Sequence, residues 1–235
     1  MSEQRLLVVN ADDLGLSAAV NDGVFLAHEE GIVTSASLMV RQGSAAAAAG
    51  QAAEHPDLAI GLHIDLGEWS YEAGDWSLAY SHCDLDDTDE VERECRAQLD
   101  RFRSLLGRDP THLDSHQHVH ESDPAKRVTE ALAAELGVPL RNRAIRYEGG
   151  FYGQSGKGDP YPEGIAPARL SELIRTLPPG WTEIGCHPAA GPVPTSSYDA
   201  EREIELATLC DPRVREALAE SGVRLRSFAQ VGQCS

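Results

Sequence analysis

The sequence predicts an irregular (β/α) barrel of about seven parallel strands, with an active site at the C-terminal ends of the strands. Short apolar segments alternate with helical patterns along the whole chain, which indicates βαβ units joined into a parallel sheet. No linker rich in Pro, Gly or Ser and no internal repeat interrupts this alternation. We therefore predict a single domain over residues 1–235, and the number of alternations favours a barrel over an open sheet.

The first half of the chain is predicted to contain three strands. Arg5–Asn10 is almost wholly apolar, as expected for a strand buried on both faces. Ser17 can cap a helix that ends near Gly31, because apolar residues recur there at helical spacing. The second and third strands are Ser35–Val40 and Leu58–Leu66, with an alanine-rich helix over residues 44–54 between them.

A loop is predicted after the third strand, and it carries Trp69, Tyr71 and Trp76. Asp87 and Glu90 then have the spacing of a capping box before a long helix that reaches residue 106. The remaining predicted elements are, in order, a strand at 111–116, a helix from Asp123-Pro124 to 137, a strand at Leu140–Arg146, a loop at 148–164, a helix from about 167, a strand at Trp181–His187, two helical stretches and a strand near Arg224–Val231.

Composition limits the partners and the compartment of the chain. The formal net charge of −18 would repel nucleic acid and an anionic membrane, so neither is expected as a partner. The five cysteines include no C-x-x-C pair, which fits a reducing cytoplasm better than a disulfide framework. The N-terminus does not read as a signal peptide, and no other stretch is long and apolar enough to cross a bilayer. We predict a cytoplasmic protein.

Polar side chains gather where the predicted strands end. The pair Asp12-Asp13 follows the first strand, His63 lies near the end of the third, and His187 ends the sixth. The fourth strand ends in the histidine-rich stretch THLDSHQHVH, residues 111–120. The C-terminal ends of parallel strands meet at one edge of a barrel, where active sites lie. A carboxylate and two imidazoles form a common divalent-metal site, with a further carboxylate and histidine available as general base and acid.

Each of these residues also has an ordinary structural interpretation. An isolated Asp-Asp pair before Leu-Gly is more often a turn, and a single histidine in an apolar strand is more often a hydrogen-bonded core residue. Within the histidine-rich stretch, alternate residues share one face of an extended strand, and these are His112, Asp114, His116, His118 and His120. His112 begins the strand, at the end away from the site, and is predicted to be structural. Taken together, the clusters favour a metal site.

Several of these segments resemble the YdjC/ChbG family of carbohydrate deacetylases. The motifs are VNADDLGLS, GLHIDLG, THLDSHQHVH and EIGCHPA, in the family's order from Val9 to Ala189, with VTSASLMV and FYG also matching. The resemblance covers nearly the whole chain. It implies an irregular (β/α) barrel and a metal-dependent hydrolase that removes an acetyl group from an N-acetylated amino sugar or short oligosaccharide. It also suggests a homodimer.

The resemblance assigns roles to individual residues. It implies that Asp13, His63 and His116 bind one divalent metal ion, either Mg²⁺ or Zn²⁺. Asp12 is then the general base and His187 the candidate general acid, with metal-bound water attacking the acetamide.

Other polar and aromatic residues are expected around this centre. Asp114 is expected to accept a hydrogen bond from a neighbouring imidazole and fix its tautomer. His118 and His120 are expected to line the pocket or contact substrate, while Gln117 is expected to face away. Trp69 and Tyr152 are equally suited to stacking on sugar rings and to packing a loop against the barrel.

The stretch after His63 departs from the family pattern of an aromatic residue followed by threonine, because it reads Ile64-Asp65-Leu66-Gly67-Glu68-Trp69. The departure suggests a different sugar or acyl group. Another barrel metallohydrolase, of the amidohydrolase or phosphoesterase type, is the second interpretation, although such enzymes usually carry H-x-H on the first strand. A non-catalytic sugar-binding protein is the third, and it would need neither a base nor an acid beside a metal.

Overall fold

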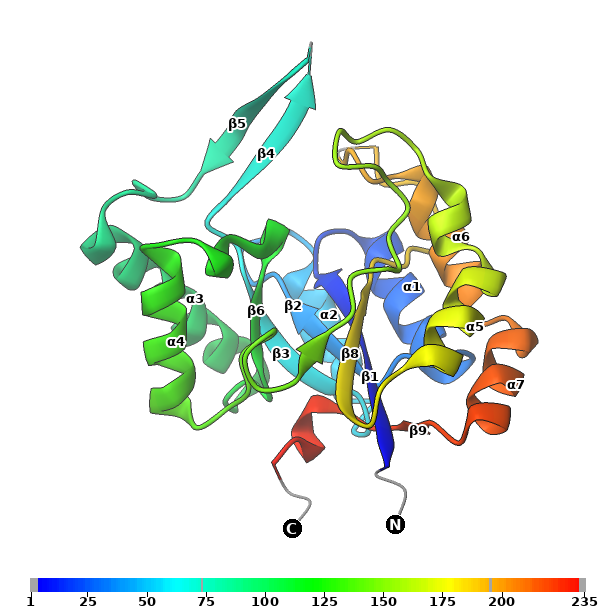
Figure 1. The fold of residues 1–235 in the computed structure, drawn as a ribbon. Helices are drawn as coiled ribbons and strands as arrows, with labels where there is room; N and C mark the ends of the chain where they lie inside the picture. Colours follow the sequence, from blue (N-terminus) through cyan, green and yellow to red (C-terminus); the bar gives the residue numbers. More distant parts are fainter. Residues whose placement is uncertain (1–3, 73, 195, 233–235) are drawn as a thin grey trace.

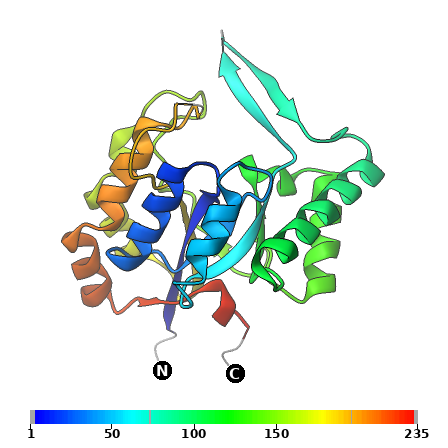
Figure 2. The same ribbon diagram turned by 180° about the vertical axis from the view of Figure 1, so that it is seen from behind.

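The computed structural model describes residues 4–72, 74–194 and 196–232. Its main sheet is parallel throughout and has the order β6-β3-β2-β1-β8-β7, with β9 also paired to β1. The strands are β1 (Arg5–Leu14), β2 (Ser35–Leu38), β3 (Ala59–Ile64), β6 (Leu113–Ser115), β7 (Arg146–Tyr147), β8 (Gly180–Cys186) and β9 (Arg224–Leu225). The sheet curls and helices cover its outside, so the predicted irregular (β/α) barrel is confirmed (Figures 1 and 2).

The barrel closes through a broken segment where a continuous fifth strand, Leu140–Arg146, was predicted. Leu140 forms a single parallel bridge with Leu113 of β6, and β7 pairs with Thr182 and Glu183 of β8. Between these contacts Asn142 takes a left-handed backbone with φ 57°. The prediction of one strand is therefore wrong, because the segment crosses from one edge of the sheet to the other and turns as it does so. The last predicted strand is also shorter, since β9 ends at Leu225 and a 3₁₀ turn follows.

Helices connect the strands on the outside of the barrel. They are α1 (Ala18–Glu29), α2 (Ala45–Ala52), α3 (Thr88–Leu106), α4 (Ala125–Leu136), α5 (Pro167–Thr176), α6 (Ala200–Leu209) and α7 (Pro212–Ser221), with 3₁₀ turns η1 (His116–Glu121), η2 (Pro162–Ile165) and η3 (Phe228–Gln230). Ser17 caps α1 as predicted, because its side chain accepts from the backbone N–H of Val20. Asp87 caps α3, while Glu90 accepts from Asp84 rather than closing a capping box. None of the described helices is long and apolar enough to cross a membrane.

An antiparallel hairpin occupies the region that was predicted to be a loop. Strands β4 (Gly67–Glu72) and β5 (Asp75–Ser81) project from the C-terminal end of the barrel (Figure 1). Trp69 pairs with Leu78, and the rings of Tyr71 and Trp76 lie 5.4 Å apart across the ribbon. Large cross-strand pairs of this kind stabilise a two-stranded ribbon. The loop prediction is wrong because these aromatic residues face each other between strands.

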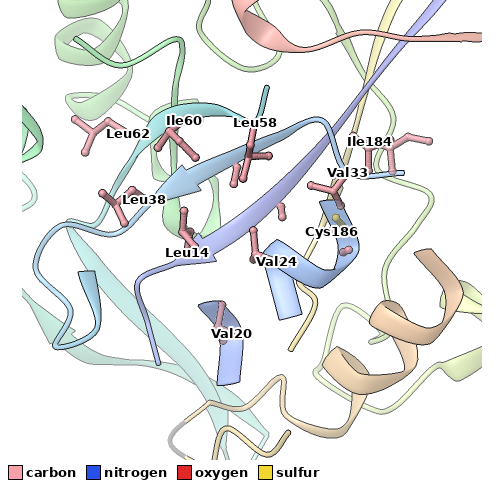
Figure 3. Packing of buried hydrophobic residues seen from close by; sticks show 14 of the residues in the cluster. Leu14, Val20, Val24, Val33, Leu38, Leu58, Ile60, Leu62, Ile184 and Cys186 are labelled. Carbon is pink, nitrogen blue, oxygen red and sulfur yellow. The ribbon is translucent and has the colours of Figure 1, made fainter. Parts of the chain in front are cut away.

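The hydrophobic core fills the space between the sheet and its helices. Figure 3 shows Leu14 of β1, Val24 of α1 and Leu38 of β2 pointing into one cluster, with Cys186 at its edge. Cys186 is fully buried and its thiol donates to the carbonyl oxygen of Asn10. The thiol therefore belongs to the core and does not form a nucleophile pair with the neighbouring His187.

His112 packs inside the barrel below the predicted site. Its ring is buried and stacks on Phe228 with the centroids 4.0 Å apart. A Cβ atom added at Gly61 would lie 2.4 Å from Cε1 of His112. Glycine is thus needed at position 61 because a histidine ring lies against the strand.

We expect Gly61→Ala to lower the free energy of unfolding by about 1–3 kcal/mol, since the ring has no space to move aside. Urea unfolding followed by circular dichroism measures this. Gly50→Ala on α2 is the matched control, because nothing lies within 4 Å of the added Cβ atom. Alanine should stabilise that helix by about 0.5–1 kcal/mol. Equal effects of the two substitutions would contradict the packing argument.

Candidate active site

A cavity of about 570 Å³ opens at the C-terminal ends of the strands. Strand ends, η1, the loops after β7 and β8, helix α6 and the β4–β5 hairpin all contribute to its wall. The lining residues are Asp12, Asp13, His63, Glu68, Trp69, Trp76, Ser115, His116, Gln117, His118, Tyr147, Gly149, Phe151, Tyr152, His187, Ser196, Ser197, Tyr198 and Arg202. Most of the residues selected from the sequence therefore meet in one place.

Asp13, His63 and His116 form one group of possible metal ligands. One ligand atom of each lies within 4.8 Å of the others. Oδ1 of Asp13 is 3.4 Å from Nε2 of His63 and 3.2 Å from Nδ1 of His116. Nε2 of His116 is buried and has no hydrogen-bond partner among the described residues. A carboxylate, two imidazoles and an unpaired buried nitrogen fit a divalent metal ion.

The two adjacent aspartates reach the same cavity because the end of β1 is irregular. Neighbouring residues of a regular strand point to opposite faces. Here the pairing of β1 with β2 shifts register between Ala11 and Leu14, and Asp13 takes a left-handed backbone with φ 63°. The irregularity turns both carboxylates toward the cavity.

Asp13 is held ionised by its surroundings. Burial would raise the pKa of its carboxyl, but Arg202 and the two histidines outweigh burial and hold the pKa well below its usual value. Nη2 of Arg202 lies 2.7 Å from Oδ2 of Asp13, and the same side chain donates from Nε to the carbonyl oxygen of Tyr198. Arg202 is buried on α6, and it was not selected from the sequence because an arginine in a helix gives no sign of its partner.

His63 is oriented by Asp114 from the neighbouring strand. Its Nδ1 lies 2.8 Å from Oδ1 of Asp114 and 3.2 Å from Oγ of Ser37, which leaves Nε2 facing Asp13. Burial would lower the pKa of His63, but the Asp114 carboxylate raises it well above its usual value. Asp114 was expected to accept a hydrogen bond from a neighbouring imidazole, and its contact with His63 is of this kind.

The alternation of the histidine-rich stretch predicted five side chains on one face. This prediction is wrong. Strand β6 ends at Ser115, and Gln117 and His118 take left-handed backbones with φ 48° and 56°. His118 lines the cavity with its ring centroid 5.2 Å from that of Tyr147. His120 does not line it, because the ring is buried with Nδ1 2.5 Å from Oγ of Ser115.

Gln117 was expected to face away, and this expectation is wrong. Its side chain lines the cavity and hydrogen-bonds the backbone of the β4–β5 hairpin. The alternation of side chains fails here because the chain has already left the strand.

Arg141 occupies the interior of the barrel beneath the cavity. Its guanidinium lies 2.6 Å and 2.7 Å from the two oxygens of Asp12, 3.0 Å from Asp114 and 2.6 Å from Glu183. Burial would raise the pKa of Asp12, but Arg141 holds it below its usual value. Burial raises the pKa of Glu183 to about 7. Asp12, His63 and Asp114 are also close enough to form a metal site, but Arg141 already pairs with both of their carboxylates.

His187 stands across from Asp12 at the end of β8. Its Nε2 is 3.9 Å from Oδ2 of Asp12, and its Nδ1 is 3.7 Å from Oε1 of Glu205. Glu205 is fully buried on α6 and also accepts from the backbone N–H of His187 and from the hydroxyl of Tyr198. Glu205 was not expected as a partner of His187, because it lies 18 residues further along the chain on a separate helix.

Aromatic rings flank the cavity on two sides. Trp69 and Trp76 line it from the hairpin, while Tyr152 lies against His187 at 5.8 Å and stacks on Tyr198 at 4.9 Å. Tyr152 keeps 42% of its surface exposed. Asp65, in the stretch that departs from the family pattern, lies buried and accepts from the hydroxyl of Tyr80.

Comparison with known proteins identifies the family. The model of the YdjC-like protein family matches residues 6–220. The chain is 37% identical to a carbohydrate deacetylase of Geobacillus stearothermophilus over 96% of its own length and 98% of the relative's. It is 35% identical to a chitooligosaccharide deacetylase of Serratia marcescens, again over 96% and 98%.

Solved structures show the same fold. A structure described as a putative cellobiose-phosphate cleavage protein of Enterococcus faecalis matches with a TM-score of 0.78 and 27% identity, over 96% of this chain and 98% of that one. A family 4 carbohydrate esterase of Streptomyces lividans matches with a TM-score of 0.57 and 11% identity over 95% and 93%, which is a likeness of fold. On its match to the family model and to these relatives, the chain belongs to the YdjC-like family.

Proposed function

We propose that the protein is a metal-dependent carbohydrate deacetylase that removes an acetyl group from an N-acetylated amino sugar or short oligosaccharide. One observation carries the proposal beyond the names of its relatives. A carboxylate and an imidazole, Asp12 and His187, flank the possible metal ligands Asp13, His63 and His116 within one cavity. Amide hydrolysis needs a base for the attacking water, an acid for the leaving amine and stabilisation of the oxyanion.

Asp13, His63 and His116 would hold one divalent ion, either Mg²⁺ or Zn²⁺. Such an ion supplies a Lewis acid for the acetamide carbonyl and a lowered pKa for a water molecule. Asp114 keeps Nε2 of His63 turned toward this centre by binding its Nδ1. The donor set does not choose between the metals, because imidazoles favour zinc and an open oxygen-rich site suits magnesium.

Asp12 is the proposed general base. A base must be ionised to accept a proton, and Arg141 keeps this carboxyl ionised and fixes its orientation with two hydrogen bonds. A water molecule between Asp12 and the acetamide would pass its proton to the carboxylate as it attacks. Asp12 can thus accept the proton while its side chain stays beside Arg141.

His187 is the proposed general acid. Its Nδ1 lies 3.7 Å from the buried Glu205 carboxylate, and its Nε2 lies 3.9 Å from Asp12 at the floor of the cavity. Protonation of the departing amine is needed because an amine anion is a very poor leaving group. The proposed base and acid thus come from the ends of two neighbouring strands, β1 and β8.

Aromatic rings at the mouth suit a sugar. Trp69 and Trp76 on one side and Tyr152 on the other present flat apolar faces with polar edges, which stack on pyranose rings. A small carbohydrate is therefore the proposed partner. A homodimer and a cytoplasmic location stay predictions from the sequence.

We expect purified protein to release acetate from diacetylchitobiose and to lose this activity in a chelator. Zn²⁺ or Mg²⁺ should restore it, and metal analysis should give about one ion per chain. His63→Asn should lose the bound metal and the activity, because a ligand is removed. His28→Asn is the matched control, since His28 lies outside the cavity and bonds the carbonyl oxygen of Val33. Bound metal without acetate release from any N-acetyl sugar would favour another barrel metallohydrolase.

A further inference from the structure

The β4–β5 hairpin forms part of the cavity wall although it projects away from the barrel (Figure 1). Trp69 and Trp76 of this hairpin both line the cavity. At its base the hairpin is tied to the barrel, because the hydroxyl of Tyr80 donates to the carboxylate of Asp65 at 3.1 Å. A two-stranded ribbon on its own is only marginally stable in water. A cavity wall built from such a ribbon therefore needs support above the base as well.

Gln117 supplies this support from the loop that follows β6. Its side-chain oxygen accepts from the backbone N–H of Trp69 at 2.8 Å, and its amide nitrogen donates to the carbonyl oxygen of Trp69 at 2.9 Å. The two bonds copy the pairing that a neighbouring strand would make. Among the described residues, no other hydrogen bond joins residues 68–79 to the barrel. The other polar approach, 3.8 Å between Glu68 and His116, is too long for a hydrogen bond.

The backbone of Gln117 is what lets its side chain reach the hairpin. Strand β6 ends at Ser115, and Gln117 takes a left-handed backbone with φ 48°. Residues other than glycine rarely adopt this conformation, and they keep it where surrounding contacts hold them in place. The side chain carries no charge, and neither of its two hydrogen bonds involves a proposed metal ligand. The contact between Gln117 and Trp69 is thus separate from the metal site.

We propose that Gln117 is a positioning residue that sets the affinity for the sugar by holding the hairpin tryptophans Trp69 and Trp76 at the cavity wall. This inference rests on the proposed function, in which these rings stack on the substrate. Binding costs less free energy when the contacting side chains are already in place than when they must be ordered as the sugar binds. Loss of the two hydrogen bonds should therefore weaken sugar binding and leave the metal and the chemical step unchanged.

The test is Gln117→Met, because methionine has a similar length but cannot hydrogen-bond the backbone of Trp69. Calorimetry with diacetylchitobiose on the metal-loaded Asp12→Asn protein measures sugar binding while slowing turnover. We expect the dissociation constant to rise about fivefold, the size expected for the loss of one net hydrogen bond. In a protein that also carries Trp69→Ala and Trp76→Ala, the same substitution should change the dissociation constant by less than about twofold, since no ring remains to be held. Hydrogen exchange of the β4 amides should be faster in Gln117→Met without any sugar.

Gln51→Met on α2 is the matched control, since Gln51 lies outside the cavity and its replacement should leave sugar binding unchanged. With Asp12 present, Gln117→Met should raise KM and keep kcat, as expected for a residue that affects binding alone. The proposal is overturned if Gln117→Met leaves the dissociation constant or the exchange of β4 unchanged, if its effect persists without the two rings, if the metal content falls, or if the sugar does not bind. Acetate release by the unmodified enzyme is scored separately. Sugar binding that depends on Gln117 in a protein that releases no acetate would contradict the deacetylase proposal and leave the positioning role standing.

Discussion

Asp12→Asn should lower kcat for acetate release by about 10²–10⁴-fold, the usual contribution of a positioned general base. The amide keeps the shape of the side chain and its place against Arg141, but it cannot accept a proton from water. The metal content should stay at its original value, because the proposed ligands Asp13, His63 and His116 are untouched. Loss of turnover with metal retained separates a base from a ligand.

Asp22→Asn on the exposed face of α1 is a suitable control and should keep full activity. Acetate release is measured under saturating sugar, and metal content by elemental analysis of the same samples. Full activity in Asp12→Asn would remove the base assignment. Loss of metal would instead place Asp12 among the ligands.

Arg141→Met should lower the free energy of unfolding by about 3–5 kcal/mol, the typical effect of removing one partner from a buried ion pair. Methionine fills much of the volume, so the main loss is the positive charge that pairs with Asp12, Asp114 and Glu183. All four side chains lie fully or almost fully inside the barrel. Water cannot replace the lost partner there without opening the core.

Arg143→Met is the matched control two residues away. Arg143 pairs with Glu121 and Glu130 at the surface, and its side chain is 30% exposed. Surface pairs contribute about 0–1 kcal/mol, so this variant should unfold close to the unmodified protein. Urea unfolding of both variants measures the difference. If Arg141→Met and Arg143→Met had similar free energies of unfolding, the carboxylates around Arg141 would have to be solvated, which would contradict their burial.

Sequence periodicity predicted the regular parts of the fold well. Arg5–Asn10 is a strand and Ser17 caps a helix, because apolar spacing and capping are local properties. The segment from Leu140 to Tyr147 was predicted less well, since its path is set by the two strands it joins rather than by its own residues. The hairpin was missed for a similar reason, because its aromatic residues also suit an irregular loop.

In the candidate site, too, features set by local sequence were predicted and those set by distant contacts were missed. Their positions at strand ends predicted that Asp12, His63 and His187 lie together, and all three line one cavity. The cationic side chains Arg141 and Arg202 were missed because their partners lie far away in sequence, and a buried arginine looks like a surface one. The prediction for Gln117 was wrong because Gln117 and His118 have left-handed backbones, which end the alternation of side chains along the strand.

The ion cluster inside the barrel also has a consequence for how such sequences change over generations. Asp12, Asp114, Arg141 and Glu183 come from four separate segments, yet their side chains meet in one buried cluster. A substitution at any one of them changes the pairing of the other three, so its effect on stability depends on which residues stand at those positions. These four distant positions should therefore be inherited as one unit, even where the surface around them diverges freely.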